Sequence, residues 1–463
     1  MMREQHHQQP KDIDGLPGLR DSSLEQHSSW NTVVSLCPEC LTVIPGVLRE
    51  SSEGLVMEKA CREHGSYRVV VSTDLNTYRS LYRAPRRATA PVEYGSTVTH
   101  GCPNDCGLCP DHDQHTCLAI LEITSRCDLQ CPICLAGSSA IGGYLELAEA
   151  ESALSKLIRY EGRPCPIQLS GGEPTLHPDL IGIVRLAASL GFKKIEVDTN
   201  GLRLAREKGL AGSLREAGLT GVYLQMDGLS GPVSEFIRGR DLVEEKLRAV
   251  ENCRKAGLQV VLSVTVVQGV NDQNLWEMVQ FGAEQKLTGV NFQAITLSGR
   301  FPQSLVYSPK RFTQGHFIHG LEEQSGGKLR ADDLTPIPCP DTRCGMLTYA
   351  LLINQEIVPL KRLLGGDRLF DFSAQMSDWE DLIRAIKPED SIGCGCDGCG
   401  GRPQTLEDLL PDSDFFSIGY HGMMDAYSLD LERVRRCCVH SITAGGTLVP
   451  FCLYNIKYRK SFC

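Results

Sequence analysis

Strand-like and helix-like stretches alternate between residues 118 and 297. The stretches typical of strands are LAILEIT (118–124), PIQLS (166–170), KKIEVDT (193–199), GVYLQMD (221–227), LQVVLSVTVV (258–267) and GVNFQAIT (289–296). Amphipathic helical stretches lie between them, and three of these end at Gly191, Gly218 and Gly257, as helices with a glycine C-cap do. This alternation predicts a parallel sheet with helices outside it, and leaves open a partial barrel of six βα units or a flat doubly wound sheet.

Cysteine is the second strong constraint, because 21 of the 463 residues are cysteine. The polar start MMREQHHQQPKDIDG has no apolar core of a secretory signal, and no stretch approaches the roughly 18 apolar residues of a membrane helix. A reducing, cytoplasmic location follows, where thiols bind metals more often than they pair. The net charge of −10 argues against nucleic acid as a partner.

A cysteine motif directly follows the first predicted strand. In TSRCDLQCPICLAG the spacing is Cys-x3-Cys-x2-Cys, at Cys127, Cys131 and Cys134. Three thiolates on one short loop can hold three irons of a [4Fe–4S] cluster, which leaves the fourth iron able to bind a small molecule. A zinc or redox cysteine set is the alternative for this motif by itself.

Polar residues end the next predicted strands. The second strand ends in SGGEPTLHP, where Gly171 and Gly172 allow close approach of a ligand and Glu173 supplies a carboxylate for an ammonium group. Since the C-terminal ends of parallel strands form the active-site edge of such sheets, these side chains are expected to meet there. The further candidates at that edge are Asn200 in DTNG and Gln225 and Asp227 in QMDG.

Together and in this order, the two motifs resemble the radical S-adenosylmethionine (radical SAM) superfamily, whose members place CxxxCxxC after the first strand and a GGEP-type motif after the second. One position departs from the pattern: the residue before the third cysteine, often aromatic in the superfamily, is Ile133, which still supplies an apolar cover. The resemblance implies an α/β fold, a radical SAM partial (β/α)6 barrel with Cys-rich N- and C-terminal metal-binding extensions.

The resemblance also implies a mechanism. The open iron of the cluster held by Cys127, Cys131 and Cys134 chelates S-adenosylmethionine, and Glu173 accepts a hydrogen bond from its amino group. Asn200, Gln225 or Asp227 contacts ribose or substrate, with an ordinary turn residue an equal alternative for Asp227. One electron, from a donor such as ferredoxin or flavodoxin, yields a 5′-deoxyadenosyl radical that takes a hydrogen atom from an unactivated C–H bond.

The other cysteines predict accessory metal sites. In GCPNDCGLCPDHDQHTC the CxxxCxxC spacing recurs, and a fourth cysteine would close an auxiliary cluster, most simply [4Fe–4S]. An N-terminal pattern of two short ligand pairs, Cys-x2-Cys and Cys-x2-His, fits a tetrahedral site for zinc or a rubredoxin-like iron. A glycine-rich C-terminal set, with zinc as the alternative, predicts a second auxiliary cluster. The three sets are Cys102, Cys106, Cys109 and Cys117; Cys37, Cys40, Cys61 and His64; and Cys394, Cys396 and Cys399 with Cys344 or Cys339.

Three cysteines near the C-terminus have no assigned role at this level. Cys437, Cys438 and Cys452 are read as cluster ligands, hydrogen-atom donors or buried thiols. The sequence alone does not choose among these three roles.

Over nearly the full chain, this layout resembles the tetraether lipid synthases, a branch also described as class D radical SAM methylases. The tail segments LERVRRCCVH (431–440) and PFCLYN (450–455) belong to that resemblance. It implies C–C bond formation between isoprenoid lipid chains or, as the alternative, methylation of a pterin-like or other small substrate with carbon from a methylene-pterin. A non-catalytic Fe–S or zinc electron carrier is a third hypothesis, against which the SGGEP motif argues.

The patterns divide the chain into four parts: a disordered tail (1–30), a Cys-rich N-terminal region (31–117), the radical SAM core (118–300) and a C-terminal extension (301–463). The expected partners are a lipid or small-molecule substrate and the electron donor, with peripheral membrane contact left open. A lipid substrate should leave an apolar channel or patch, although core packing is the commoner role of such residues. The candidates for that patch are Phe312, Phe317, Phe415 and Phe416.

Overall fold

A small antiparallel sheet forms the N-terminal part of the chain. The computed structural model describes residues 29–84, 88–305, 311–337, 339–353, 356–364 and 414–459. Strands β1 to β4 pair in chain order, and one face packs against α1 through a small cluster that includes Leu48, Leu55 and Tyr78. The bounds are β1 Ser29–Leu36, β2 Val43–Ser51, β3 Gly54–Cys61, β4 Gly65–Ser72 and α1 Leu75–Arg83.

The second sheet contains the predicted βα repeat. Six strands, β5 to β10, are parallel and lie side by side in chain order, which confirms the partial barrel. Their bounds lie within or close to the predicted stretches, and the first coincides with LAILEIT. They are β5 Leu118–Thr124, β6 Ile167–Gly171, β7 Ile195–Thr199, β8 Gly221–Gln225, β9 Gln259–Val266 and β10 Gly289–Ala294.

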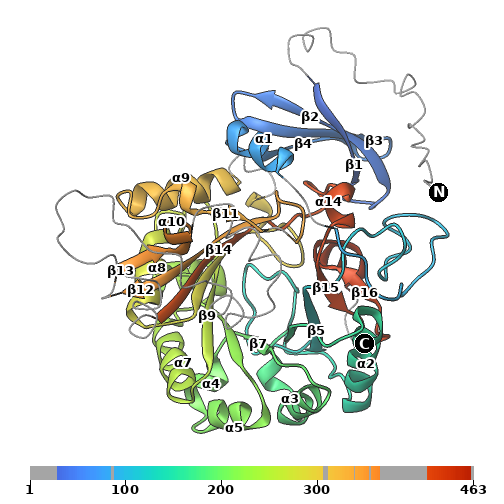
Figure 1. The fold of residues 1–463 in the computed structure, drawn as a ribbon. Coiled ribbons are helices and arrows are strands. Elements are labelled where there is room, and N and C mark those ends of the chain that lie inside the picture. Colours follow the sequence, from blue (N-terminus) through green and yellow to red (C-terminus); the bar gives the residue numbers. More distant parts are fainter. Residues whose placement is uncertain are drawn as a thin grey trace.

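Helices cover one side of this sheet (Figure 1), as the βα alternation predicts. Leu169, Val197 and Leu262 of the strands share one buried cluster with Leu154 of α2 and Val250 of α7. None of the helices in the described ranges is long and apolar enough to cross a membrane. The helices are α2 Leu147–Glu161, α3 Leu180–Ser189, α4 Leu202–Arg206, α5 Leu210–Ala217, α6 Gly231–Arg238, α7 Val243–Lys255, α8 Leu275–Glu284 and α9 Gln314–Gln324.

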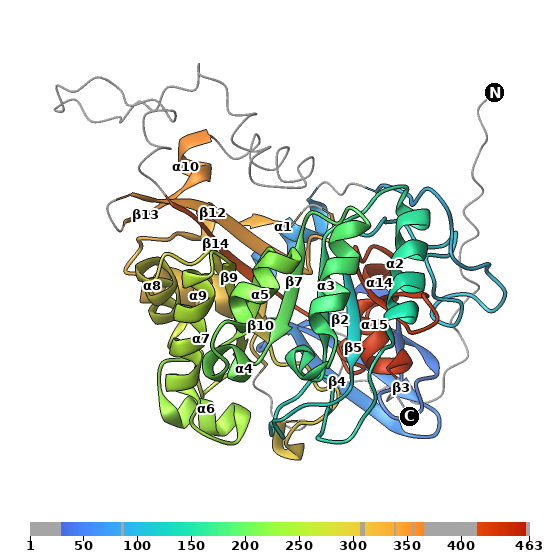
Figure 2. The ribbon, with the colours of Figure 1, turned by 90° about the horizontal axis from the view of Figure 1, so that it is seen from below.

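The C-terminal region extends the sheet at both edges. Strand β14 (Asp414–His421) is parallel to β10, and β15 (Val439–Ile442) is parallel to β5, so residues 422–438 connect the two edges of the curved sheet. The described strands after residue 300 therefore extend the barrel sheet (Figure 2). The other elements here are β11 Thr335–Pro336, β12 Gly345–Ile353, β13 Glu356–Pro359, α10 Leu360–Leu364, α14 Leu431–Arg435, β16 Leu448–Pro450 and α15 Phe451–Leu453.

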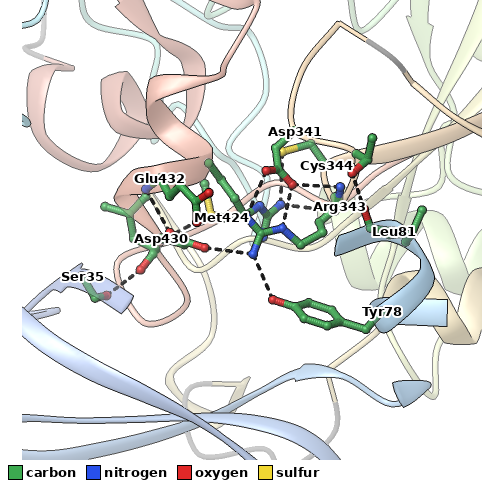
Figure 3. A network of polar contacts seen from close by, with 12 residues as sticks. Ser35, Tyr78, Leu81, Asp341, Arg343, Cys344, Met424, Asp430 and Glu432 are labelled. Carbon is green, nitrogen blue, oxygen red and sulfur yellow. Dashed lines mark hydrogen bonds and ion pairs between the residues drawn. The ribbon is translucent and has the colours of Figure 1, made fainter. Parts of the chain in front are cut away.

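A buried arginine ties the N-terminal part to the C-terminal region (Figure 3). Arg343 pairs with Asp341 through two hydrogen bonds, Nε to Oδ1 at 2.7 Å and Nη2 to Oδ2 at 2.9 Å. Its Nη1 donates to Asp430 at 3.2 Å and to the hydroxyl of Tyr78 in α1 at 3.1 Å. Since these groups come from three separate segments, Arg343 fixes how α1, the 341–344 loop and α14 pack together.

Candidate active site and metal centres

The cysteine motif lies on the loop that follows β5. This loop is held in place by Arg300, whose backbone N–H and C=O pair with Cys134 at 2.8 Å each. The Arg300 side chain donates from Nη1 to the carbonyl of Cys131 at 2.9 Å and from Nη2 to that of Ser138 at 2.6 Å. The loop backbone is thus fixed by the segment that follows β10, which sequence reasoning did not anticipate.

The three thiols of this loop lie in a setting that suits a metal cluster. None of the three is in a disulfide bond. Cys131 is buried, and Cys127 and Cys134 are half-buried. Burial raises the pKa of the Cys127 thiol to about 12 and also raises the pKa of Cys131. Such thiols keep their protons at neutral pH unless a metal replaces them. Three soft sulfur donors on one loop fit an iron–sulfur cluster, and we propose them as its ligands.

The glycines of the SGGEP motif contact the chain itself. Gly171 has a φ of +131°, and a Cβ there would lie 2.0 Å from the carbonyl oxygen of Thr124. A Cβ on Gly172 would lie 2.2 Å from the carbonyl oxygen of Arg126. The close backbone approach that we expected toward a ligand is therefore made to residues 124–126, directly before the cysteine loop. The two glycines position that loop, and their contact with the cofactor stays a proposal.

Glu173 is buried beside the strand end. Its Oε1 accepts hydrogen bonds from the backbone of Thr175 at 3.0 Å and from the hydroxyl of Thr199 at 2.6 Å, and its Oε2 accepts from the backbone of Asn200 at 2.7 Å. Burial raises the pKa of Glu173, and these hydrogen bonds oppose that rise. Oε2 keeps one acceptor site, so a bond from the amino group of S-adenosylmethionine stays a proposal.

Asp227 holds an arginine against the cysteine loop. Its carboxylate accepts from Nε and Nη2 of Arg238 at 2.7 and 2.8 Å, and the positive charge of Arg238 lowers the pKa of Cys131 against the effect of burial. This ion pair is buried, since the side chains of Arg238 and Asp227 are 11% and 2% exposed. Asp227 is therefore more than the turn residue that the sequence allowed.

A second buried cation joins two predicted site residues. Lys246 donates to the backbone carbonyl of Asn200 and to Oε1 of Gln225, and Asn200 itself donates to Asp128 at 2.7 Å. Burial lowers the pKa of Lys246 to about 8. With Arg238, this lysine places positive charge next to the cysteine loop, which suits an anionic cluster or a ligand carboxylate. Neither Arg238 nor Lys246 belongs to a motif that would predict this role from the sequence.

The side of the barrel sheet that faces away from the helices is predominantly polar. Successive residues of a strand point to opposite faces of the sheet. In each barrel strand, the residues that alternate with those packed against the helices therefore line the inner face. Most of them keep some exposure, so the inner face offers hydrogen-bonding groups to a ligand. They are Glu122, Gln168, Ser170, Glu196, Asp198, Tyr223, Gln225, Ser263, Thr265, Asn291 and Gln293, with Ile120 and Val261 as apolar exceptions.

The aromatic residues considered for a lipid channel lie elsewhere. Phe312, Phe317 and Phe416 are buried in the core cluster, and the ring of Phe415 lies against Tyr349 at a centroid distance of 5.2 Å. Their packing role agrees with the commoner expectation for such side chains and provides no lipid site.

The N-terminal metal prediction matches the geometry. Cys37 and Cys40 lie in the turn after β1, Cys61 is the last residue of β3, and His64 lies in the turn after it. Their ligand atoms all lie within 4.8 Å of one another. Hydrogen bonds with Thr42 lower the pKa of Cys40 to about 6, so it is a thiolate at neutral pH. We propose this quartet as a tetrahedral site.

Replacing one quartet ligand should release its metal. For Cys40→Ser we expect the loss of about one metal ion per chain, because a three-ligand structural site binds far more weakly. Zinc and iron are measured together by mass spectrometry, with Cys165→Ser as the control outside any cysteine group. Unchanged metal content in Cys40→Ser would contradict this site.

The first CxxxCxxC set forms a separate group. Cys102, Cys106 and Cys109 influence one another electrostatically and line one pocket with Arg435. Burial raises the pKa of Cys106 to about 12, as expected for a thiol whose proton a metal would replace. We propose these three as ligands of an auxiliary site.

Cys117 meets residues outside that group, and its role as the fourth ligand stays a prediction. Cys339 and Cys438 both act on the pKa of its thiol, and its sulfur lies 3.5 Å from Nε2 of His115. The backbone N–H of Cys117 also donates to the carbonyl of Cys438 at 2.8 Å. The reason is topological: Cys117 directly precedes β5, and β15, which follows Cys438, pairs with β5.

If the Cys106 group and the Cys438 group bind separate metals, the metal losses caused by replacing one cysteine in each group should add. We expect Cys106→Ala and Cys438→Ala each to lower the metal content, and the double variant to lose the sum of both. Sites without shared ligands behave independently. Iron and zinc analysis of the four proteins checks this, and a double variant that loses no more than one single variant would show a shared site.

A further group involves Cys344, Cys437 and Cys452. Burial and the charges of Cys452 and Cys344 raise the pKa of Cys437 to about 12, and burial and the charge of Cys344 raise the pKa of Cys452 to about 11. Arg433 donates to the sulfur of Cys344 at 3.3 Å, and the backbone of Met424 donates to that of Cys452 at 3.3 Å. Cys344 thus has two cysteine neighbours that the sequence did not assign to it. Its predicted partners Cys394, Cys396 and Cys399 lie outside the described residues.

Comparisons with known proteins agree with this geometry. A model of the radical SAM superfamily matches residues 121–282, and a model of the HMPTM N-terminal zinc ribbon domain matches residues 30–73. The 7,8-dihydro-6-hydroxymethylpterin dimethyltransferase of Methanocaldococcus jannaschii is 31% identical over 92% of this chain and 94% of its own length. The chain belongs to the radical SAM superfamily. It is a radical SAM enzyme with a [4Fe–4S] cluster and S-adenosylmethionine as cofactors, and it has additional metal-binding parts.

Other relatives share only part of the chain. A probable GTP 3′,8-cyclase of Methanothermobacter thermautotrophicus is 32% identical over 36% of this chain and 53% of its own length. The crystal structure of Streptococcus suis SuiB bound to S-adenosylmethionine has 14% identity and a TM-score of 0.36, and the match covers 46% of this chain and 47% of that one.

Proposed function

We propose that the chain is a radical SAM methyltransferase that acts on a pterin. The observation that carries this proposal is the polar inner face of the barrel. A planar heterocycle with several ring nitrogens can use the hydrogen-bonding sites that remain there, for example on Asp198, whereas an isoprenoid chain would bury each such site unpaired at a cost of roughly 1–3 kcal/mol.

The similarity to the pterin dimethyltransferase supports the same substrate class. It extends over both the barrel and the N-terminal sheet, so it covers the cysteine groups as well as the radical SAM motifs. Similarity at this level does not by itself fix a substrate, and the polar inner face is the independent support.

Each part of the site has a role in this proposal. When bound, the cluster and S-adenosylmethionine supply a 5′-deoxyadenosyl radical at the strand ends. Arg238 and Lys246 place positive charge beside them, and Glu173 fixes the end of β6 against Asn200. The inner-face side chains hold the substrate within reach of that radical and shield the site from bulk water.

The lipid-coupling hypothesis lacks comparable support. The four phenylalanines that it invoked pack elsewhere, and no curated relative named above acts on lipids by its name. Membership of a superfamily of S-adenosylmethionine-cleaving enzymes also argues against the non-catalytic electron carrier.

The proposal is tested under anoxic conditions with the metal-loaded enzyme, dithionite and S-adenosylmethionine. We expect a methylated product from 7,8-dihydro-6-hydroxymethylpterin when a methylene-tetrahydropterin supplies the carbon, detected by mass spectrometry. Isoprenoid diether lipids are offered in a parallel reaction. Coupled lipid without any methylated pterin would overturn the proposal.

A further inference from the structure

Asp198 stands out among the inner-face carboxylates. It lies next to last in β7 and accepts one hydrogen bond, from the hydroxyl of Ser170 at 3.0 Å. Since an ionised carboxylate has about four acceptor sites, most of its capacity is available to a ligand. Burial raises its pKa to about 6, and Glu173 and Arg238 act on it electrostatically, so it lies between the cofactor site and the barrel interior.

The other inner-face carboxylates are already engaged. Glu122 pairs with Arg459 at 2.6 Å and accepts from the hydroxyl of Tyr454 at 3.0 Å. Glu196 lies two residues deeper in β7 than Asp198 and pairs with Lys194 at 3.4 Å. Asp198 is therefore the carboxylate of this face that is best able to accept from a ligand.

The spare acceptor sites of Asp198 suit one edge of a pterin. The pyrimidine edge presents the 2-amino group, N3–H and the 4-oxo group side by side, which are two donors followed by an acceptor. We propose that Asp198 accepts hydrogen bonds from the 2-amino group and N3–H. This inference rests on the proposed function and names the residue that would select its substrate.

The matched variants are Asp198→Asn and Glu196→Gln, which each replace one carboxylate of β7 by an amide. Two probes differ at one group: 7,8-dihydro-6-hydroxymethylpterin and its lumazine analogue, which carries a 2-oxo group in place of the 2-amino group. Binding is measured by equilibrium dialysis with metal-loaded protein and S-adenosylmethionine, without reductant.

We expect the unaltered enzyme to prefer the pterin, and Glu196→Gln to keep that preference. Asp198→Asn should bind the pterin at least about tenfold more weakly, because one charged acceptor becomes a donor facing the 2-amino group. The same donor suits the 2-oxo group, so this variant should bind the lumazine as well as or better than the pterin. Retained lumazine binding also shows that the variant is folded.

The other outcomes separate the two claims. If the unaltered enzyme binds neither probe, the pterin substrate itself is wrong and this inference falls with it. If it binds the pterin and Asp198→Asn binds it equally well, only the role of Asp198 is overturned. Equal loss of both probes in Asp198→Asn would also overturn that role, because recognition of the pyrimidine edge predicts a change in preference.

Discussion

Replacing Cys131 with Ala should reduce the formation of 5′-deoxyadenosine from S-adenosylmethionine to background. Cys131 is buried at the centre of the cysteine loop, next to the positive charge of Arg238. A site with two sulfur ligands instead of three would not hold the cluster that supplies the electron. The reaction with dithionite, followed by liquid chromatography, measures this, and iron analysis shows the accompanying loss of the cluster.

The matched control for this variant is Cys253→Ala. Cys253 is a buried thiol of α7 that packs in the helical core, and burial alone raises its pKa to about 12. Removing this thiol changes packing only, so S-adenosylmethionine cleavage should be kept. Cleavage at an undiminished rate in Cys131→Ala would contradict the assignment of the cluster ligands.

Replacing Arg343 with Ala should lower the free energy of unfolding by about 3–5 kcal/mol, because it leaves buried carboxylates without their cation. Asp341 and Asp430 are both buried and both pair with Arg343, as Figure 3 shows. The positive charge of Arg343 also holds the pKa of Asp341 below its usual range, against the effect of burial. Urea unfolding of metal-loaded protein under anoxic conditions measures the loss.

Two further variants make the Arg343 result specific. Arg343→Lys keeps the charge but not the paired geometry to Asp341, so its loss should be smaller than that of Arg343→Ala. Lys255→Ala removes an exposed pair with Glu251, so its cost should be far smaller than that of Arg343→Ala. If Arg343→Ala cost no more than Lys255→Ala, the network would not join the segments as we describe.

The barrel was predictable because its signals are local. Strand β5 coincides with LAILEIT, and the glycines that end the predicted helices lie at their ends in the structure, for example Gly218 after α5. Such stretches carry their own periodicity and their own end signals. The order of the two radical SAM motifs then placed the site at the strand ends.

The auxiliary cysteine groups were only partly predictable. Spacing identified Cys37, Cys40, Cys61 and His64, because each pair lies at one tight turn. It did not reveal that pairing between β5 and β15 brings Cys438 next to Cys117 from more than three hundred residues away. Long-range strand pairing leaves no mark in local spacing, and the same holds for Arg300 and Lys246.

Some predictions stay as they were. The cytoplasmic location and the ferredoxin- or flavodoxin-type electron donor remain predictions, as do the division into residues 1–30, 31–117, 118–300 and 301–463 and any membrane contact. The described part of the last region forms strands of the barrel sheet, so its function is tied to that of the core.

The most direct test of the central claim follows one hydrogen atom. The metal-loaded enzyme, reductant and S-adenosylmethionine are incubated with 7,8-dihydro-6-hydroxymethylpterin that carries deuterium at its saturated carbons. We predict that deuterium appears in 5′-deoxyadenosine, because the pterin held on the inner face gives its hydrogen to the radical. Turnover that leaves 5′-deoxyadenosine free of deuterium would contradict a pterin as the molecule that this radical attacks.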